Sequence, residues 1–330
     1  MTSSAPGQAP SELVCLTGMH RSGTSLLARV ASLLGVDLGA PDALMGPGPD
    51  NPAGYWENRA IKELDDELLA HLGGAWDQPP LLESGWPLDP GLDPFRERAL
   101  EILGRDLARP SSADGPTGCK EPRLCLLHPF WRTVVTISHT VVVVRHPVEV
   151  VASLRRRNGM EPGQGAILWL RYLLAVTAEP ALLLRLDDLT DQPDETAARI
   201  AAHLGLPEPA RDRLDEVRAS HDPALLHRGA GALAPTDPAP SSPNLDLAMV
   251  VWNDGEIDVT ALPDALRAAL AQGWLGPPEN RAALDAARAE SVELREKLRK
   301  WHRRRKAQEA ADPDAPLPPL PDVDGEDDEP

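Results

Sequence analysis

Residues 13–34 read LVCLTGMHRSGTSLLARVASLL, and this stretch decides the fold of the chain. The apolar run Leu13–Leu16 predicts a short strand, and Leu26–Leu34 predicts a helix that Gly35 can end. The loop between them, Gly18–Ser25, contains two glycines. A strand, a glycine loop and a helix in this order present backbone N–H groups and a helix N-terminus to an anion, so the segment predicts an anion-binding loop.

The loop differs at a decisive position from the phosphate-binding loop of ATPases and GTPases. Thr24 stands where the pattern GxxxxGK[ST] has its lysine, and a cation appears earlier, as Arg21. Because that lysine reaches the β- and γ-phosphates, its replacement argues against hydrolysis of ATP or GTP. A tight turn whose glycines merely let the helix pack on the strand is the alternative interpretation at this point.

Strands alternate with helices over most of the chain. Thr140–Val144 and Leu182–Leu186 are apolar runs that suit strands buried on both faces. Helices are predicted over 56–72, 94–108, 147–157 and 194–204. This alternation indicates an α/β fold with a parallel sheet, which we assign to residues 12–276. Two stretches rich in Pro and Gly are predicted as loops, 37–54 and 222–246, and the second is a long loop or lid.

The two ends of the chain differ in composition from its centre. Residues 1–11 are predicted to be a flexible N-terminus, and residues 311–330, with eight acids and no base, a disordered acidic tail. A basic helix is predicted over 277–310, and its apolar residues recur at heptad spacing. A coiled-coil homodimer through residues 279–306 and docking of this helix on its own chain are both open interpretations.

Charge and cysteine content exclude several classes of protein. The 33 Lys and Arg residues against 51 Asp and Glu give a formal net charge of −18, which argues against general affinity for nucleic acid or an anionic membrane. Three cysteines without CxxC spacing fit neither a disulfide framework nor a zinc site. We find no signal peptide and no run of about 18 apolar residues, so we predict a cytoplasmic protein without stable membrane insertion.

Three longer segments carry a family resemblance. They are GMHRSGTSLLARVASLLGV from Gly18, VVVVRHPVEVVASLRRR from Val141 and LLLRLDDLTDQPDETAARIAAHLGLP from Leu182. In this order, over about residues 12–207, they resemble sulfotransferases that use 3′-phosphoadenosine 5′-phosphosulfate (PAPS). The bacterial, carbohydrate-type and tyrosylprotein-type members are the most similar. The first segment resembles the family's 5′-phosphosulfate loop, the second its 3′-phosphate site, and the third the strand and helix that follow.

The resemblance implies PAPS as co-substrate and a P-loop-like parallel sheet flanked by helices. It implies that the 5′-phosphosulfate is bound by Gly18, His20, Arg21, Ser22, Gly23, Thr24 and Ser25. It implies that Arg145 and Ser153 bind the 3′-phosphate, and both can indeed face a ligand above the sheet. Alternatively, Arg145 pairs with Glu149, Ser153 is a solvated helix residue and His20 is a packing residue. Arg228 matches the family's C-terminal Arg-Lys-Gly loop only in part.

Three side chains are predicted to carry out the chemistry. Aromatic neighbours can desolvate Glu57 and improve it as a base, and the resemblance implies a glutamate base at a comparable place. Lys120, in a Lys-Glu-Pro segment, resembles a family lysine that approaches the bridging oxygen, and Arg21 joins it in stabilising the transferring and leaving oxygens. With these cations no metal is expected. A helix-opening role for Glu57 and a solvated loop position for Lys120 are the alternatives, and Lys62 is predicted at the surface.

The predicted function is in-line transfer of a sulfuryl group from PAPS to a hydroxyl or amine. The expected partner is a small-molecule or glycan acceptor, that is, a carbohydrate, lipid or small metabolite, and no nucleic acid is expected. Two other functions stay open. One is a metal-dependent P-loop kinase, and the other is a non-catalytic nucleotide-fold scaffold that acts through its C-terminal helix.

Overall fold

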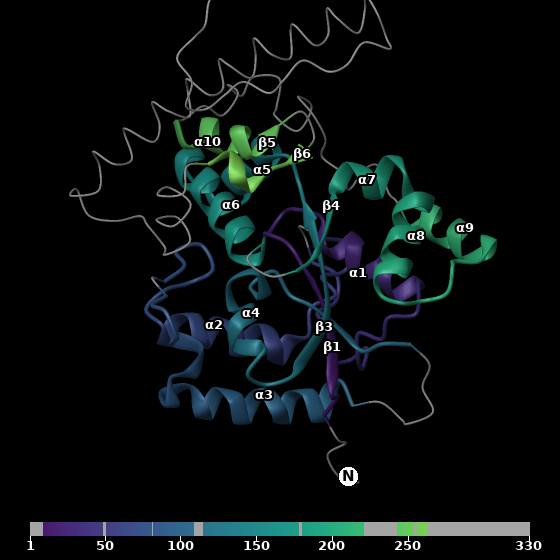
Figure 1. Cartoon of the computed structure of the whole chain (residues 1–330), viewed down its shortest axis with the longest axis horizontal. Coiled ribbons are helices and arrows are strands. Elements are labelled where there is room, and N and C mark those ends of the chain that lie inside the picture. The colour runs from purple at the N-terminus through teal and green to yellow at the C-terminus, as the bar shows by residue number, and fades with distance from the viewer. Residues whose placement is uncertain are drawn as a thin grey trace, which may run out of the picture.

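Four parallel strands form the main sheet of the computed structural model, which describes residues 9–48, 51–80, 82–108, 115–177, 180–220, 243–253 and 256–262. The strands are β1 (Glu12–Thr17), β2 (Gly118–Lys120), β3 (Thr136–Val144) and β4 (Leu182–Arg185). They lie in the order β2-β1-β3-β4, every pairing is parallel, and helices flank the sheet (Figure 1). The predicted α/β fold with a parallel sheet is confirmed.

Alternate residues of the central strands face two separate hydrophobic clusters. On β1, Leu13 and Cys15 belong to one cluster, whereas Val14 and Leu16 belong to the other. The four valines at positions 141–144 of β3 alternate in the same way. A strand that is buried on both faces needs apolar residues at consecutive positions, which explains why these segments are unbroken apolar runs.

Each hydrophobic cluster is completed by its own set of helices. The cluster with Leu13 is completed by α2 (Arg59–His71), α3 (Asp93–Asp106), α4 (Leu124–Trp131), α5 (Pro147–Asn158), α6 (Pro162–Thr177) and α10 (Pro243–Val251). The cluster with Val14 is completed by α1 (Thr24–Leu33), α7 (Leu186–Asp191), α8 (Pro193–His203) and α9 (Arg211–Ala219). In Figure 1 the first set includes α2, α3 and α6 on the left, and the second lies on the right. The remaining elements are β5 (Trp252–Asn253), β6 (Glu256–Ile257) and the 3-10 turns η1 (Trp86–Leu88), η2 (Pro90–Leu92) and η5 (Val259–Ala261).

Most predicted elements are present with slightly shifted ends. These are β1, α1, α3, β3, α5, β4 and α8. The sequence does not predict β2 or α6. With three residues, β2 is too short to show a period. α6 is buried along most of its length, so it lacks the apolar stripe that marks a half-exposed helix.

Two predicted boundaries are wrong. The helix predicted over 56–72 begins at Arg59, because Asn58 is its N-cap and its side-chain oxygen accepts a 3.0 Å hydrogen bond from the Ile61 N–H. Glu57 therefore precedes the helix and does not open it. The loop predicted over 222–246 extends too far, because α10 begins at Pro243, and the fixed φ of proline suits the first turn of a helix. The rest of that stretch, residues 222–242, lies outside the described residues.

Several predicted features lie outside the described residues. They are Arg228, the basic helix over 277–310 with its dimer segment 279–306, the acidic tail over 311–330 and most of the N-terminus over 1–11. Of the helices that the structure describes, none is long and apolar enough to cross a membrane.

The carboxyl ends of the strands bring distant segments together. In the register of the sheet, Leu16 of β1 lies beside Lys120 of β2, and Val144 of β3 lies beside Arg185 of β4. The glycine loop directly follows β1, and Arg145 directly follows β3. Ligands of parallel α/β sheets bind in the crevice outside the carboxyl ends of the strands, so this edge is where a site is expected.

Position 18 requires glycine because its backbone lies directly against β3, which leaves no room for a side chain. Its φ is +147°, and a Cβ added there would lie 2.2 Å from the Val143 carbonyl oxygen. We expect Gly18→Ala to lower the free energy of unfolding by about 2–5 kcal/mol, since the new methyl group strains φ and also displaces β3. Gly35→Ala is the matched control, because Gly35 has a φ of +101° but no atom within 4 Å of the added Cβ. It should lose only about 1–2 kcal/mol in urea unfolding, and equal losses in the two variants would contradict a steric role of β3.

Candidate active site

A pocket lies at the carboxyl ends of the strands, where separate segments of the chain meet. Its lining comes from the glycine loop and α1, the segment 51–57, the residues at the ends of β2 and β3, the start of α7, and the ends of α5 and α9. The pocket volume is about 170 Å³. A single water needs roughly 10–15 Å³ by the same measure, so the pocket has room for a small molecule.

Positive charge dominates the lining of this pocket. Five lining residues carry a cationic side chain, whereas Glu57 is the one carboxylate among them. The cations are Arg21, Arg29, Lys120, Arg145 and Arg157. On a chain with a formal net charge of −18, this cluster is a local concentration of positive charge that is suited to an anion. Guanidinium groups suit phosphate and sulfate oxygens, because their planar fork donates two parallel hydrogen bonds.

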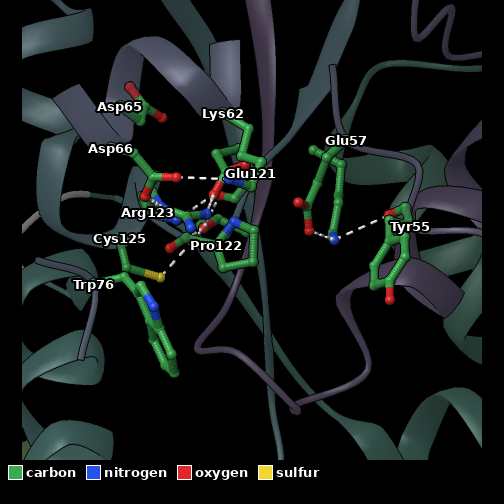
Figure 2. A network of polar contacts seen from close by, with 12 residues as sticks. Tyr55, Glu57, Lys62, Asp65, Asp66, Trp76, Glu121, Pro122, Arg123 and Cys125 are labelled. Carbon is green, nitrogen blue, oxygen red and sulfur yellow. Dashed lines mark hydrogen bonds and ion pairs between the residues drawn. The ribbon is translucent and has the colours of Figure 1, made fainter. Parts of the chain in front are cut away.

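Lys120 and Glu57 form a buried ion pair in the pocket wall. The Nζ atom of Lys120 lies 2.6 Å from Oε1 of Glu57 and also donates a 3.0 Å hydrogen bond to the Tyr55 carbonyl oxygen (Figure 2). The side chains of Lys120 and Glu57 are 2% and 9% exposed. Two predicted catalytic residues that lie 63 positions apart in the chain are therefore in direct contact. Lys120 is not the solvated loop residue of the alternative interpretation.

The segment 51–57 is fastened to the glycine loop. The Asn51 side-chain amide donates a 2.9 Å hydrogen bond to the Ser25 hydroxyl oxygen. Ser25 in turn donates a 3.2 Å hydrogen bond to the Tyr55 carbonyl oxygen, which also accepts from Lys120. These contacts fix the loop that carries the carboxylate against the loop that follows β1.

Arg21 connects the glycine loop to α5. Its Nε atom donates a 3.0 Å hydrogen bond to the Ser153 hydroxyl oxygen, and its own carbonyl oxygen accepts a 3.3 Å hydrogen bond from Arg145. Arg21, one of the residues to which the resemblance assigns the 5′-phosphosulfate, therefore contacts both residues to which it assigns the 3′-phosphate, Arg145 and Ser153. Arg21 has a φ of +70°, a conformation that costs a residue with a side chain of order 1–3 kcal/mol.

Arg145 fits both interpretations that the sequence left open, since it pairs with Glu149 and also lines the pocket. Its Nε atom lies 2.7 Å from Oε2 of Glu149, as in the alternative interpretation, and the residue also lines the pocket. Its backbone is fixed by a 3.0 Å hydrogen bond from the Trp169 indole to its carbonyl oxygen. Ser153 is buried and does not line the pocket, so its link to the pocket is through Arg21.

The other residues of the glycine loop divide into two groups. His20, Gly23, Thr24 and Ser25 line the pocket. Gly18 lies against β3, and the side chain of Ser22, which is 1% exposed, faces a small cavity on the other side of the loop that Met19 and Cys125 also line. Gly18 and Ser22 therefore offer no side chain to a ligand of the main pocket.

His20 packs among aromatic rings beside the pocket. Its ring centroid lies 4.5 Å from that of Trp76 and 5.8 Å from that of Tyr172. Burial, together with the charges of Arg123 and Lys120, holds the pKa of His20 well below its ordinary value, so the imidazole is neutral at pH 7. His20 is therefore both a packing residue, as in the alternative interpretation, and a residue of the pocket wall.

A second buried polar network adjoins Lys120 in the chain. Arg123 donates a 2.7 Å hydrogen bond to Oε1 of Glu121 and a 2.6 Å hydrogen bond to Asp66, which also pairs with Lys62 (Figure 2). Burial and the charge of Glu57 raise the pKa of Glu121. This network fixes the segment that follows Lys120 and keeps Lys62 out of the pocket. Within the parts of the chain that the structure describes, no group of three or more His, Cys, Asp or Glu side chains is arranged to hold a metal ion.

Several residues of the pocket are not predicted from the sequence. Arg29 lines it and donates a 3.3 Å hydrogen bond to the carbonyl oxygen of Ser220, another lining residue. Arg157 is exposed at the end of α5 and also lines the pocket. A signal for both arginines exists, because each lies four residues after a predicted site serine, Ser25 or Ser153, and so on the same face of its helix.

Several solved structures that are similar to this chain are sulfotransferases. The sulfotransferase domain of the Synechococcus PCC 7002 olefin synthase is 17% identical with a TM-score of 0.40, over 76% of this chain and 98% of that one. Sulfotransferase STF1 from Mycobacterium tuberculosis H37Rv is 15% identical with a TM-score of 0.37, over 65% of this chain and 72% of that one. Mouse sulfotransferase SULT7A1, complexed with PAP, is 14% identical with a TM-score of 0.34, over 87% of this chain and 85% of that one. No protein-family model and no curated protein matches the chain. Since these TM-scores lie below 0.5, the proposal for function rests on the pocket.

Proposed function

We propose that the chain is a sulfotransferase that uses PAPS. The observation that carries the proposal is the buried pair of Lys120 and Glu57 beside the glycine loop, in a pocket with five cationic side chains. The motifs that build this pocket are those through which the sequence resembles PAPS sulfotransferases. The proposed acceptor is a hydroxyl or amine of a carbohydrate, lipid or small metabolite.

The cations of the pocket are proposed to hold the two anionic ends of PAPS. The N-terminus of α1 and the side chain of Arg21 bind the 5′-phosphosulfate. Arg145 binds the 3′-phosphate, and Ser153, whose oxygen accepts a hydrogen bond from Arg21, supports this part of the site through Arg21. Hydrogen bonds to charged groups contribute roughly 1.5–3 kcal/mol each, so a few such contacts hold the nucleotide on an otherwise acidic protein.

The proposed reaction is an in-line displacement at sulfur. An acceptor oxygen or nitrogen forms a bond to sulfur while the bond from sulfur to the 5′-phosphate oxygen breaks, and adenosine 3′,5′-bisphosphate leaves. The acceptor proton passes to Glu57, whose Oε1 is held by Lys120, so that Oε2 takes the proton. Lys120 and Arg21 stabilise the negative charge on the leaving and equatorial oxygens.

Titration calorimetry tests whether the pocket is built for two phosphates. We expect adenosine 3′,5′-bisphosphate to bind roughly 10- to 100-fold more tightly than adenosine 5′-phosphate, because the second phosphate meets its own cation. Arg145→Ala should remove most of this difference. Arg156→Ala is the control, because Arg156 is exposed on α5, the helix that begins just after Arg145, and lies outside the pocket. Tight binding of ATP without binding of the bisphosphate would contradict the proposal and favour a kinase.

A further inference from the structure

Trp56 has a backbone conformation that tryptophan rarely adopts. Its φ is +62°, in the left-handed region that favours glycine. Over the described ranges, Arg21 and Trp56 are the residues other than glycine with a positive φ, and both line the pocket. Backbone strain that persists at a site points to a function of the residue that carries it.

The hydrogen bonds next to Trp56 are made by the backbone of Tyr55, and they do not involve the indole of Trp56. The Tyr55 carbonyl oxygen accepts hydrogen bonds from Lys120 and Ser25, and these fix the turn just before position 56. A turn with positive φ is supplied without strain by glycine, as Gly54 does with a φ of +91°. The presence of tryptophan is therefore explained by its side chain and not by the turn.

The indole of Trp56 is fixed at the pocket wall. Its Nε1 atom donates a 3.2 Å hydrogen bond to the Ala53 carbonyl oxygen, and its ring packs, as Leu26 does, against the hydrophobic cluster that includes α1. The side chain is nevertheless only half-buried and lines the pocket. A ligand can therefore reach a ring that is already held in place.

Apolar groups share the pocket with its cations. Besides Trp56, the lining includes Leu26, Tyr55, Pro122 and Leu186. A ligand that fits both kinds of wall carries negative charge and also an apolar group. Among apolar groups, a flat ring is the one that can stack on the large aromatic face of tryptophan.

We propose that Trp56 is the platform on which a flat ring of the bound ligand stacks. The inference rests on the proposed function and deepens it, since it concerns the same pocket. Two sources can supply the ring: the adenine base of the nucleotide, and a ring of the acceptor that enters beside Glu57. Loss of a base–aromatic stack weakens binding by roughly 5- to 150-fold, which is large enough to measure.

Three substitutions at one position separate stacking from backbone strain. Trp56→Phe keeps an aromatic face, Trp56→Ala removes the face but keeps the strain, and Trp56→Gly removes the face and relieves the strain. The probes for calorimetry are adenosine 3′,5′-bisphosphate, inorganic pyrophosphate, and 2-naphthol added to protein saturated with the bisphosphate. Trp86→Ala is the matched control, because Trp86 is also half-buried but lies outside the pocket.

We expect Trp56→Ala and Trp56→Gly to bind one ring-bearing probe roughly 5- to 150-fold more weakly, while Trp56→Phe and Trp86→Ala stay close to wild type. Pyrophosphate, which has no ring, should bind equally to all variants. A loss confined to the bisphosphate assigns the platform to the nucleotide base, and a loss confined to 2-naphthol assigns it to the acceptor. The melting temperature of Trp56→Gly should be no lower than that of Trp56→Ala, because glycine relieves the backbone strain. Weaker binding by Trp56→Gly could then not be attributed to unfolding of the protein.

Unchanged affinity of Trp56→Gly for both ring-bearing probes would overturn the inference. An equal loss for pyrophosphate would also overturn it, because the indole would then merely support the shape of the site. Failure of the proposed function looks different. Wild-type protein that binds ATP but not the bisphosphate rejects the sulfotransferase, and the same variants then measure stacking with ATP as the ring-bearing probe.

Discussion

Lys120→Met is expected to lower kcat for sulfuryl transfer by roughly 10²–10³-fold, the loss typical of removing one group that stabilises charge in a transition state. Two hydrogen bonds fix the ammonium, to Glu57 and to the Tyr55 carbonyl oxygen, and the Lys120 side chain is 2% exposed. In a site so closed to water, one charge has a larger effect than it has in solvent. Initial rates at saturating PAPS measure the effect on kcat, and calorimetry with adenosine 3′,5′-bisphosphate shows whether nucleotide binding survives.

The same variant is also expected to be less stable. Without Lys120, Glu57 is a buried carboxylate that has lost its partner, which costs roughly 3–5 kcal/mol, and adding Glu57→Gln should recover most of this loss. Lys62→Met is the matched control, since Lys62 lies at the same 2.6 Å from its partner Asp66 but the two side chains are 29% and 36% exposed. That variant should lose at most about 1 kcal/mol and keep its kcat. If Lys120→Met were as active as Lys62→Met, Lys120 would have no catalytic role.

Glu57→Gln is expected to lower kcat by roughly 10²–10⁴-fold, the usual contribution of a general base. The amide has the shape of the carboxylate, and its oxygen can still accept the hydrogen bond from Lys120, but it cannot take a proton from the acceptor. The affinity for adenosine 3′,5′-bisphosphate should stay close to that of wild type, because Glu57 is not proposed to bind the nucleotide. Rates and binding measured on the same preparation separate the two effects.

Glu63→Gln is the control for this substitution, because Glu63 is an exposed acid of α2 outside the pocket. It removes one negative charge from the same part of the chain and should leave both kcat and binding unchanged. A Glu57→Gln variant that kept the kcat of Glu63→Gln would show that the proton goes elsewhere, and the base would have to be sought among the other residues of the pocket.

The parts of the site that the sequence predicts are those whose residues are neighbours in the chain. The glycine loop is recognisable because a strand, two glycines and a helix follow one another within residues 13–34. Arg145 is recognisable because it ends a run of valines and precedes a proline that can begin a helix. The chemistry of Glu57 and Lys120 is suggested by their residue types, by their immediate neighbours and by the family resemblance.

Other parts of the site depend on contacts that no local pattern records. The pairing of Glu57 with Lys120 joins residues 63 positions apart. Lys120 is also held by the Tyr55 carbonyl oxygen, and a backbone carbonyl gives no signal in the sequence because every residue has one. The left-handed φ of Trp56 contradicts the preference of tryptophan, which is why the predicted helix wrongly included it. Asn58 is a good N-cap residue, so the sequence did hold a signal for the true start of α2.

The central claim is that this pocket transfers a sulfuryl group, and following labelled sulfur tests it most directly. Purified protein is incubated with sulfur-labelled PAPS and a pool of carbohydrate, lipid and small-metabolite acceptors, and in parallel with γ-phosphorus-labelled ATP and the same pool. We predict that label moves from PAPS to an acceptor with wild-type protein, and that Glu57→Gln loses this transfer while it still binds adenosine 3′,5′-bisphosphate. Transfer of label from ATP with none from PAPS would contradict the claim.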